Sequence, residues 1–231
     1  MNLLKPLAAA VLAFSAFGAS AAPVYDIAAD FSVTNNPSGV WTYGETNGFG
    51  GAFTKFTDSG TTSTIDFWRG ANPMFGTPVL YHNNSATPFI SGSASYGPFE
   101  AGFHPGVGDR DTTYRFTAPT SGLYAFDGRF FGQDTSGTTT EVRLFVNSMQ
   151  QGAPIDVTGF GAPSTQIRAS TFTLAAGDFL DISVGNRGSV FNDSTGLAVT
   201  ISAVPVPEPQ TVGLMLAGLA MVGVAGKRRK A

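Results

Sequence analysis

The sequence predicts an all-β protein, an antiparallel β-sandwich or jelly roll, flanked by an N-terminal signal peptide and a C-terminal hydrophobic helix. Three observations support this fold class. Apolar and polar residues alternate with period two through most of the chain. Turn-forming clusters of Gly, Pro, Asn, Asp and Ser separate the alternating stretches, with no amphipathic helical pattern between them. Of the 231 residues, 42% are apolar and 20 are Phe, enough to build a core.

The first 21 residues have the order of a secretory signal peptide. Lys5 supplies a short basic region, residues 7–17 are apolar, and small residues follow at Ala19 and Ala21. We place the cleavage after Ala21, because cleavage after Ala22 would leave a proline as the first residue. The alternative, a buried N-terminal helix, is disfavoured by this order of features. A signal peptide implies export through the Sec translocon.

Residues 22–203 are predicted to form one β-sandwich domain. The alternation is clearest in five apolar sets: Tyr114 and Phe116; Tyr124, Phe126 and Phe130; Val142, Leu144 and Val146; Leu180, Ile182 and Val184; Leu197, Val199 and Ile201.

The N-terminal part of this domain is less regular. Strands are expected at residues 25–33, 52–57, 64–68 and 78–81, and the frequent Gly and Pro favour long loops or edge strands there. One domain is favoured over two, since no linker-like composition divides the chain.

Charge and cysteine content restrict the function. Residues 22–207 contain eight Lys and Arg against fifteen Asp and Glu, a net charge of −7, which argues against a nucleic-acid partner. The chain has no Cys, so an exported body must be stabilised by its core alone.

The C-terminal segment has three parts. Residues 204–209 alternate Pro with other residues and form an extended spacer, which contains Pro207, Glu208 and Pro209. An apolar run over residues 212–226 is predicted to be a helix of roughly 22 Å, short of a bilayer core of about 30 Å. A basic cluster follows, made of Lys227, Arg228, Arg229 and Lys230, which would stay on the inner side of a membrane.

This order of Pro-Glu-Pro, thin apolar helix and basic stop resembles the PEP-CTERM sorting signal, here over residues 207–231. The resemblance implies an exosortase-type membrane peptidase as partner, and a Gram-negative bacterium that makes exopolysaccharide. It also implies that the helix anchors the protein only transiently, before the protein reaches the cell surface or extracellular matrix. A plain tail anchor is the alternative.

A second resemblance covers most of residues 30–203. It rests on NPSGVWTYG at 36–44, HPG at 104–106, RFTAP at 115–119 with residues 122–124, VN at 146–147, LAAGD at 174–178 and DSTGL at 193–197. These stretches resemble an uncharacterised β-sandwich of PEP-CTERM and planctomycete surface proteins, which implies the same fold and no activity.

No motif in the sequence predicts catalysis, a cofactor or a transition-metal site. His82 and His104 are the only histidines and have no paired ligand spacing. His104 is interpreted as a loop residue whose ring bonds to nearby backbone, with a general base as the alternative. Three strand acids, Asp127, Glu141 and Asp181, are expected to be exposed to solvent.

Two carboxylates, Asp109 and Asp111, flank Arg110 and raise the question of a Ca²⁺ site. The spacing lacks the usual loop pattern, and Arg110 is placed to neutralise both carboxylates. A solvated turn is therefore the preferred interpretation.

Aromatic residues give the one hint of binding. Trp41, Tyr43 and Trp68 lie in Gly-rich or turn-rich sequence, where exposed rings would stack on sugars; burial in the core is the preferred alternative. The sequence thus predicts a non-enzymatic, exported structural or adhesive protein. A carbohydrate-binding module for matrix polysaccharide is the second hypothesis. The third is a glycan-acting hydrolase, with His104 and Asp109 as the first residues to inspect.

Overall fold

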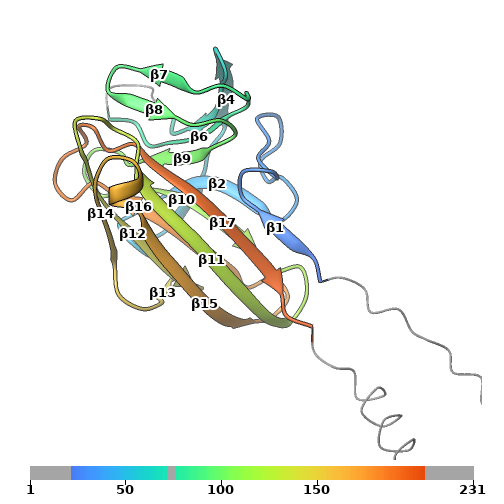
Figure 1. Ribbon diagram of the computed structural model, residues 1–231. Coiled ribbons are helices and arrows are strands. Elements are labelled where there is room, and N and C mark those ends of the chain that lie inside the picture. The colour runs from blue at the N-terminus through green and yellow to red at the C-terminus, as the bar shows by residue number, and fades with distance from the viewer. Residues whose placement is uncertain (1–21, 72–75, 206–231) are drawn as a thin grey trace, which may run out of the picture.

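The computed structural model describes residues 22–71 and 76–205, which form two large antiparallel sheets packed face to face (Figure 1). Within these ranges the one helical element is a single 3-10 turn, η1 (Ala162–Ser164). The architecture confirms the all-β sandwich that the alternating pattern predicts.

The larger sheet has eight strands. In spatial order they are β15 (Gln166–Leu174), β11 (Gly122–Gly132), β17 (Thr195–Ala203), β9 (Ala101–His104), β6 (Val79–Asn83), β5 (Ile65–Arg69) and β4 (Asp58–Thr62), with β1 (Val24–Asp26) also paired to β17.

The second sheet has seven strands, and a small hairpin stands apart from both sheets. The seven are β13 (Met149–Gln150), β12 (Thr138–Val146), β16 (Phe179–Gly185), β10 (Arg110–Thr117), β2 (Trp41–Asn47) and β3 (Phe53–Lys55), with β14 (Ile155–Gly159) also paired to β12; the hairpin is β7 (Phe89–Ser91) and β8 (Ala94–Tyr96).

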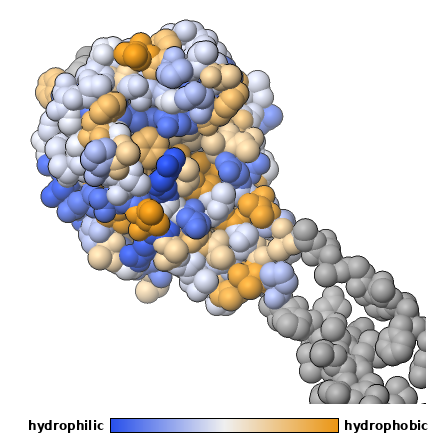
Figure 2. Space-filling view, in the orientation of Figure 1, coloured by the Kyte–Doolittle hydropathy of each residue, from blue (hydrophilic) through white to orange (hydrophobic). Residues whose placement is uncertain are grey.

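The core lies between the sheets and is rich in aromatic rings. The rings of Phe116 on β10 and Tyr124 on β11 are 5.6 Å apart, and those of Phe103 on β9 and Tyr114 on β10 are 6.0 Å apart. All four side chains are fully buried. The five alternating apolar sets all lie on strands, and every member is buried except Val146, which is partly exposed. Polar and apolar residues are interspersed on the face shown in Figure 2.

The N-terminal half differs from its prediction in the length of its first strand and in the position of several strands within the sheets. The strand expected over residues 25–33 ends at Asp26, because the Asp26 carboxylate accepts the N–H groups of Ala28 and Ala29 at 2.9 and 3.0 Å and so forms a turn. The expectation of loops or edge strands is wrong for β5, β6 and β9, which are interior strands of the larger sheet, and for β2, which lies between β10 and β3. Its Gly44 admits the close approach of β3, since an added Cβ would lie 2.4 Å from the Thr54 carbonyl oxygen.

The chain enters and leaves the sandwich at the same end (Figure 1). β1 pairs antiparallel with β17, and Val24 lies opposite Ser202. The nine residues of β17 span about 30 Å, so the loop before Thr195 lies at the far end of the molecule.

Candidate functional site

The three aromatic residues proposed as sugar contacts lie in the core, so that hypothesis is wrong. Trp41 and Tyr43 are 0% exposed and Trp68 is 6% exposed. Each polar atom of the two indoles is used internally: Trp41 Nε1 donates to the Asp30 carboxylate at 3.1 Å, and Trp68 Nε1 donates to the Ser32 carbonyl at 2.6 Å. The preferred alternative, burial in the core, describes them correctly.

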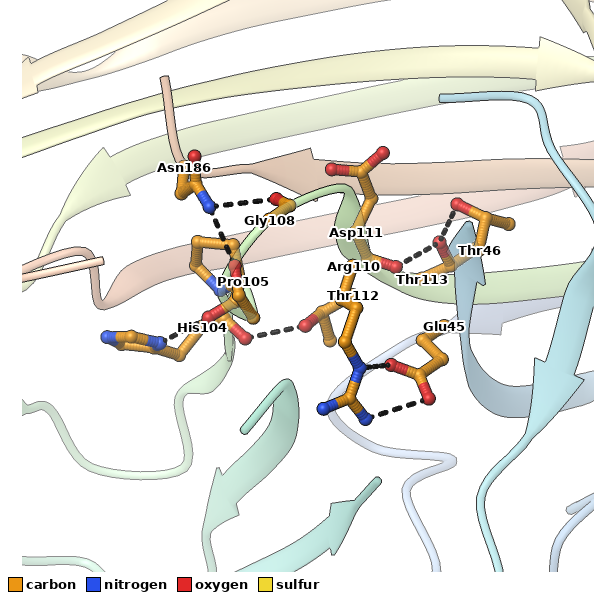
Figure 3. Close-up of polar contacts among 11 residues, drawn as sticks. Glu45, Thr46, His104, Pro105, Gly108, Arg110, Asp111, Thr112, Thr113 and Asn186 are labelled. Atoms are coloured by element: carbon orange, nitrogen blue, oxygen red, sulfur yellow. Dashed lines mark hydrogen bonds and ion pairs between the residues drawn. The ribbon is translucent and has the colours of Figure 1, made fainter. Parts of the chain in front are cut away.

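His104 is fixed by its own backbone neighbour, as the sequence predicts, although it ends a strand (β9) instead of lying in a loop. Its Nδ1 lies 2.8 Å from the Pro105 carbonyl oxygen and therefore carries the donated proton (Figure 3). Burial lowers the pKa of His104, and the Pro105 carbonyl opposes this only in part. The ring is accordingly neutral near pH 7.

Arg110 does not neutralise the two aspartates beside it, contrary to the sequence prediction. Its Nε and Nη2 donate to the Glu45 carboxylate on β2 at 2.8 and 3.0 Å (Figure 3). Strand alternation explains the difference, because neighbouring residues of β10 point to opposite faces. Arg110 therefore reaches across the sheet to β2 and not along its own strand.

Asp111 is buried and not part of a solvated turn. It is 5% exposed, and its Oδ2 has no hydrogen-bond partner among the described residues. Burial, and then the charge of Asp109, raise the pKa of Asp111 to about 7. Residues 22–71 and 76–205 contain no cluster of three or more His, Asp or Glu residues that could hold a metal ion.

Asp181 is also buried, although exposure to solvent was expected. Only 1% of its side chain is exposed, and it pairs with Arg115 on the neighbouring strand. Asp127 is exposed as predicted, and Glu141 is partly buried beside Arg143.

The main candidate site is a cleft of about 610 Å³ over the β4–β5–β6 part of the larger sheet. Its floor contains Ile65, Phe67 and Arg69, the alternate residues of β5. Trp68 points the other way and stacks on Tyr43 of β2, with ring centroids 6.0 Å apart. The cleft therefore lies on the face that points away from the second sheet.

The walls of the cleft combine rings with hydrogen-bonding groups. Tyr96 of β8 and His104 form one part of the lining, and Val190, Phe191, Asn192 and Ser194 form another. Within this loop, Phe191 is 65% exposed and Asn192 and Ser194 supply polar groups. A few polar groups among apolar ones, in a hollow of this volume, are typical of small-ligand sites.

Buried aspartates hold the loop of the wall in place. The Ser194 N–H donates to Asp134 at 2.6 Å, and Asp193 accepts the Thr139 N–H and hydroxyl, both at 3.3 Å. Asp134 and Asp193 are at most 2% exposed. Ser194, which lines the cleft, is thus bonded to the loop that connects β11 of the larger sheet to β12 of the second sheet.

Among the described residues, Arg69 is the one Asp, Glu, Lys or Arg that lines the cleft. Its Cζ lies 4.9 Å from the centre of the Phe67 ring, and its Nε donates to Asp58 of β4 at 2.6 Å. Its side chain is 35% exposed. The guanidinium of Arg69 therefore lies over the Phe67 ring on the floor of the cleft.

The sequence analysis missed this site, although one signal was present. A strand was expected at residues 64–68, and alternation places the neighbours of Trp68 on the face opposite to it. Identifying the indole of Trp68 as buried in the core would have placed Phe67 and Arg69 on the opposite, partly exposed face. The remaining wall residues come from distant loops, which no local pattern brings together.

The terminal predictions lie outside the described residues. These are Ala19 and Ala21, the tripeptide from Pro207 to Pro209, the helix over residues 212–226, and the basic cluster from Lys227 to Lys230. No helix within residues 22–71 and 76–205 is long and apolar enough to span a membrane.

The family model for the PEP-CTERM protein-sorting motif matches residues 205–230. The chain carries a PEP-CTERM sorting motif. This confirms the resemblance found in the sequence and begins two residues after β17 ends. The PEP-CTERM motif implies processing by exosortase, a membrane protein, and marks the chain as exported and sorted to the cell surface.

The folded body is similar to several solved structures at low sequence identity. A family 35 carbohydrate-binding module from Clostridium thermocellum is 14% identical, with 55% of this chain and 92% of that chain covered and a TM-score of 0.30. Rabbit GITRL is 16% identical, with 42% and 74% covered and a TM-score of 0.26. The M60 catalytic domain with CBM51 domains from Clostridium perfringens ZmpB is 8% identical, with 65% and 20% covered and a TM-score of 0.36. Likenesses this distant do not bear on function. No curated protein matches the sequence.

Proposed function

We propose that this protein is a non-enzymatic adhesive module of the cell surface or extracellular matrix, and that its β-sandwich binds matrix polysaccharide in the cleft over β4, β5 and β6. The sequence left a structural or adhesive role and a carbohydrate-binding role as separate hypotheses. The cleft supports carbohydrate binding, and we propose that the protein adheres to the matrix by this binding.

The position of the cleft relative to the sorting motif is the observation that carries the proposal. Asn192 and Ser194 line the cleft and directly precede β17, whereas the PEP-CTERM motif begins just after β17. The two are separated by about 30 Å of strand. A protein attached by its C-terminal segment would therefore hold the cleft away from the attachment point and toward the matrix.

The chemistry of the cleft suits a pyranose. The C–H groups of a sugar pack on the electron-rich face of an aromatic ring, and Phe67 and Phe191 supply rings. Hydroxyl and amide groups for sugar hydroxyls come from Thr62 and Asn192.

The lining also supports binding without hydrolysis. Most glycosidases need two carboxyl groups across the bond that is cleaved. Of the residues within 22–71 and 76–205 that line the cleft, none is Asp or Glu. His104, the one histidine there, has Nδ1 bonded to the Pro105 carbonyl and a neutral ring.

The sequences at the two ends of the chain support export of the protein and its sorting to the cell surface or matrix. Residues 1–21 would direct export through the Sec translocon, and the helix over residues 212–226 would hold the protein in the membrane until exosortase acts at Pro207, Glu208 and Pro209. The source would then be a Gram-negative bacterium with an exopolysaccharide locus.

Affinity electrophoresis of the full chain in gels that contain the source cell's matrix polysaccharide tests the function. We expect retardation of the unmodified chain, and its loss in Phe67→Ala and Phe191→Ala. Ile167→Ala is the matched control, since Ile167 is 76% exposed on β15 and does not line the cleft. Equal retardation of all three variants would reject the cleft, and no retardation of any chain would reject the function.

A further inference from the structure

The cleft contains one fixed charge in a protein of opposite net charge. Residues 22–207 carry a net charge of −7, yet the described part of the lining has no carboxylate and one guanidinium, that of Arg69. A ligand that enters meets a cation next to a ring. The charge of Arg69 therefore restricts which polysaccharide fits best.

Two contacts fix the orientation of Arg69. In the β4–β5 pair, Asp58 lies directly opposite Arg69, and Gly60 lies opposite Phe67. Asp58 accepts one bond from Nε at 2.6 Å, while the guanidinium carbon lies 4.9 Å from the Phe67 ring centre. A guanidinium held on two sides loses less conformational entropy when it binds a ligand.

The bond to Asp58 uses Nε, one of the five N–H groups of the guanidinium. Asp58 itself does not line the cleft. The planar fork of arginine matches the two oxygens of a carboxylate, and such charge-assisted pairs are about twice as strong as neutral hydrogen bonds. A neutral sugar hydroxyl would use only part of this capacity.

We infer that the cleft recognises an acidic polysaccharide whose pyranose units bear a carboxylate, with the sugar face on the aromatic floor and the carboxylate on Arg69. This inference rests on the proposed function and adds the ligand class to it. It also gives the acidic body a role in selectivity, because its net negative charge disfavours a polyanion that is not paired with a cation such as Arg69.

The test compares each polyuronate with its own carboxyl-reduced form, in which the same backbone carries primary alcohols. The full chain is titrated with polygalacturonate, polyglucuronate and alginate, with the three reduced polymers, and with dextran sulfate. We expect at least one polyuronate to bind on the order of tenfold more tightly than its reduced form, as one charge-assisted contact would give. Dextran sulfate should bind more weakly than that polyuronate.

Variants assign the preference to Arg69. Arg69→Gln should bind the acidic and reduced polymers equally, and Arg69→Lys should keep part of the preference, since it keeps the charge without the fork. Arg129→Gln is the matched control, because Arg129 is exposed on β11 outside the cleft. Arg69→Gln should fold, since its pair with Asp58 is partly exposed and contributes little to stability.

The outcomes separate the inference from the proposed function. Equal affinity for acidic and reduced polymers, or a preference that survives in Arg69→Gln, would overturn the inference and leave glycan binding intact. Dextran sulfate binding as tightly as the best polyuronate would replace a carboxylate site with a general anion site. No binding of any polymer would overturn both.

Discussion

Arg115 and Asp181 form a two-bond ion pair on neighbouring strands of the second sheet. Arg115 Nε and Nη2 donate to the two carboxylate oxygens at 2.7 and 2.8 Å. The guanidinium lies between two rings, 4.0 Å from the centre of Phe53 and 3.8 Å from that of Phe179. The ion pair and the two rings therefore cover each other on the face of this sheet that points away from the core.

Removal of Arg115 should destabilise the body strongly, because Asp181 would stay buried without its counter-ion. We expect Arg115→Leu to lower the free energy of unfolding by about 3–5 kcal/mol, measured by urea denaturation at pH 7. The double variant Arg115→Leu/Asp181→Leu should recover most of this loss. As a control, Asp156→Ala breaks the exposed pair with Arg187, which is 3.3 Å long, and should cost less than about 1 kcal/mol.

The pH dependence of Arg115→Leu identifies the cause. Burial raises the pKa of Asp181, and Arg115 lowers it through a hydrogen bond and its charge. Without Arg115 the carboxyl holds its proton more tightly in the folded state than in the unfolded state, so the variant should lose less stability at pH 5 than at pH 8. A loss independent of pH would show that only packing was changed.

The buried tryptophans should respond to unfolding and not to direct contact with a sugar. Trp41 is 0% exposed and Trp68 is 6% exposed. We expect blue-shifted emission and weak quenching by acrylamide, both reversed by denaturant. Trp41→Ala should lower the free energy of unfolding by about 3–5 kcal/mol. Native stability in that variant would contradict the core position.

The sequence predicted the fold class because strand alternation is a local pattern. The alternation of apolar and polar residues is enough to predict the strands that contain Tyr114 with Phe116 and Leu197 with Val199. β2 was missed because its sequence, WTYGETN, is mostly polar by letter, although four of its seven residues are buried and the strand lies between β10 and β3. An interior strand whose residues are mostly polar can be recognised only when the strands beside it are known.

The candidate site was missed for a different reason. The strand was predicted correctly, but Trp68 was named as the candidate ligand contact in place of Phe67 and Arg69. Alternation separates the two faces of a strand without showing which of them is buried. Trp68 faces β2, while Phe67 and Arg69 face the cleft. The wall residue Phe191 is more than a hundred positions away, and only the order of strands in the larger sheet brings it there.

Stability should depend on pH through Asp111. Burial raises its pKa from 3.8 to about 7, so the folded state binds this proton more tightly than the unfolded state. Its contribution to the free energy of unfolding therefore falls as pH rises from 3.8 to about 7 and is constant above that. We expect Asp111→Asn to stabilise the body at pH 8 by on the order of 2 kcal/mol and to have little effect near pH 4.

Thermal unfolding of both chains across this pH range checks the sign. Asp127→Asn is the control, since Asp127 is exposed on β11 and its charge is already solvated. A difference between Asp111→Asn and the unmodified chain that grows toward low pH would contradict the assignment.

The Phe67 ring packs against Gly60, where the missing side chain leaves room for it. The two residues lie opposite each other in the β4–β5 pair, and an added Cβ at Gly60 would be 3.0 Å from Cζ of the ring. Gly60→Val should push the half-buried ring into the cleft, with a loss of about 1–3 kcal/mol in stability and a larger relative loss of polysaccharide affinity. Gly122→Val is the matched control, because an added Cβ at Gly122 meets nothing within 4 Å. Denaturation and affinity electrophoresis of the two variants separate the effects. Unchanged retardation of Gly60→Val would mean that the position of the Phe67 ring does not determine binding.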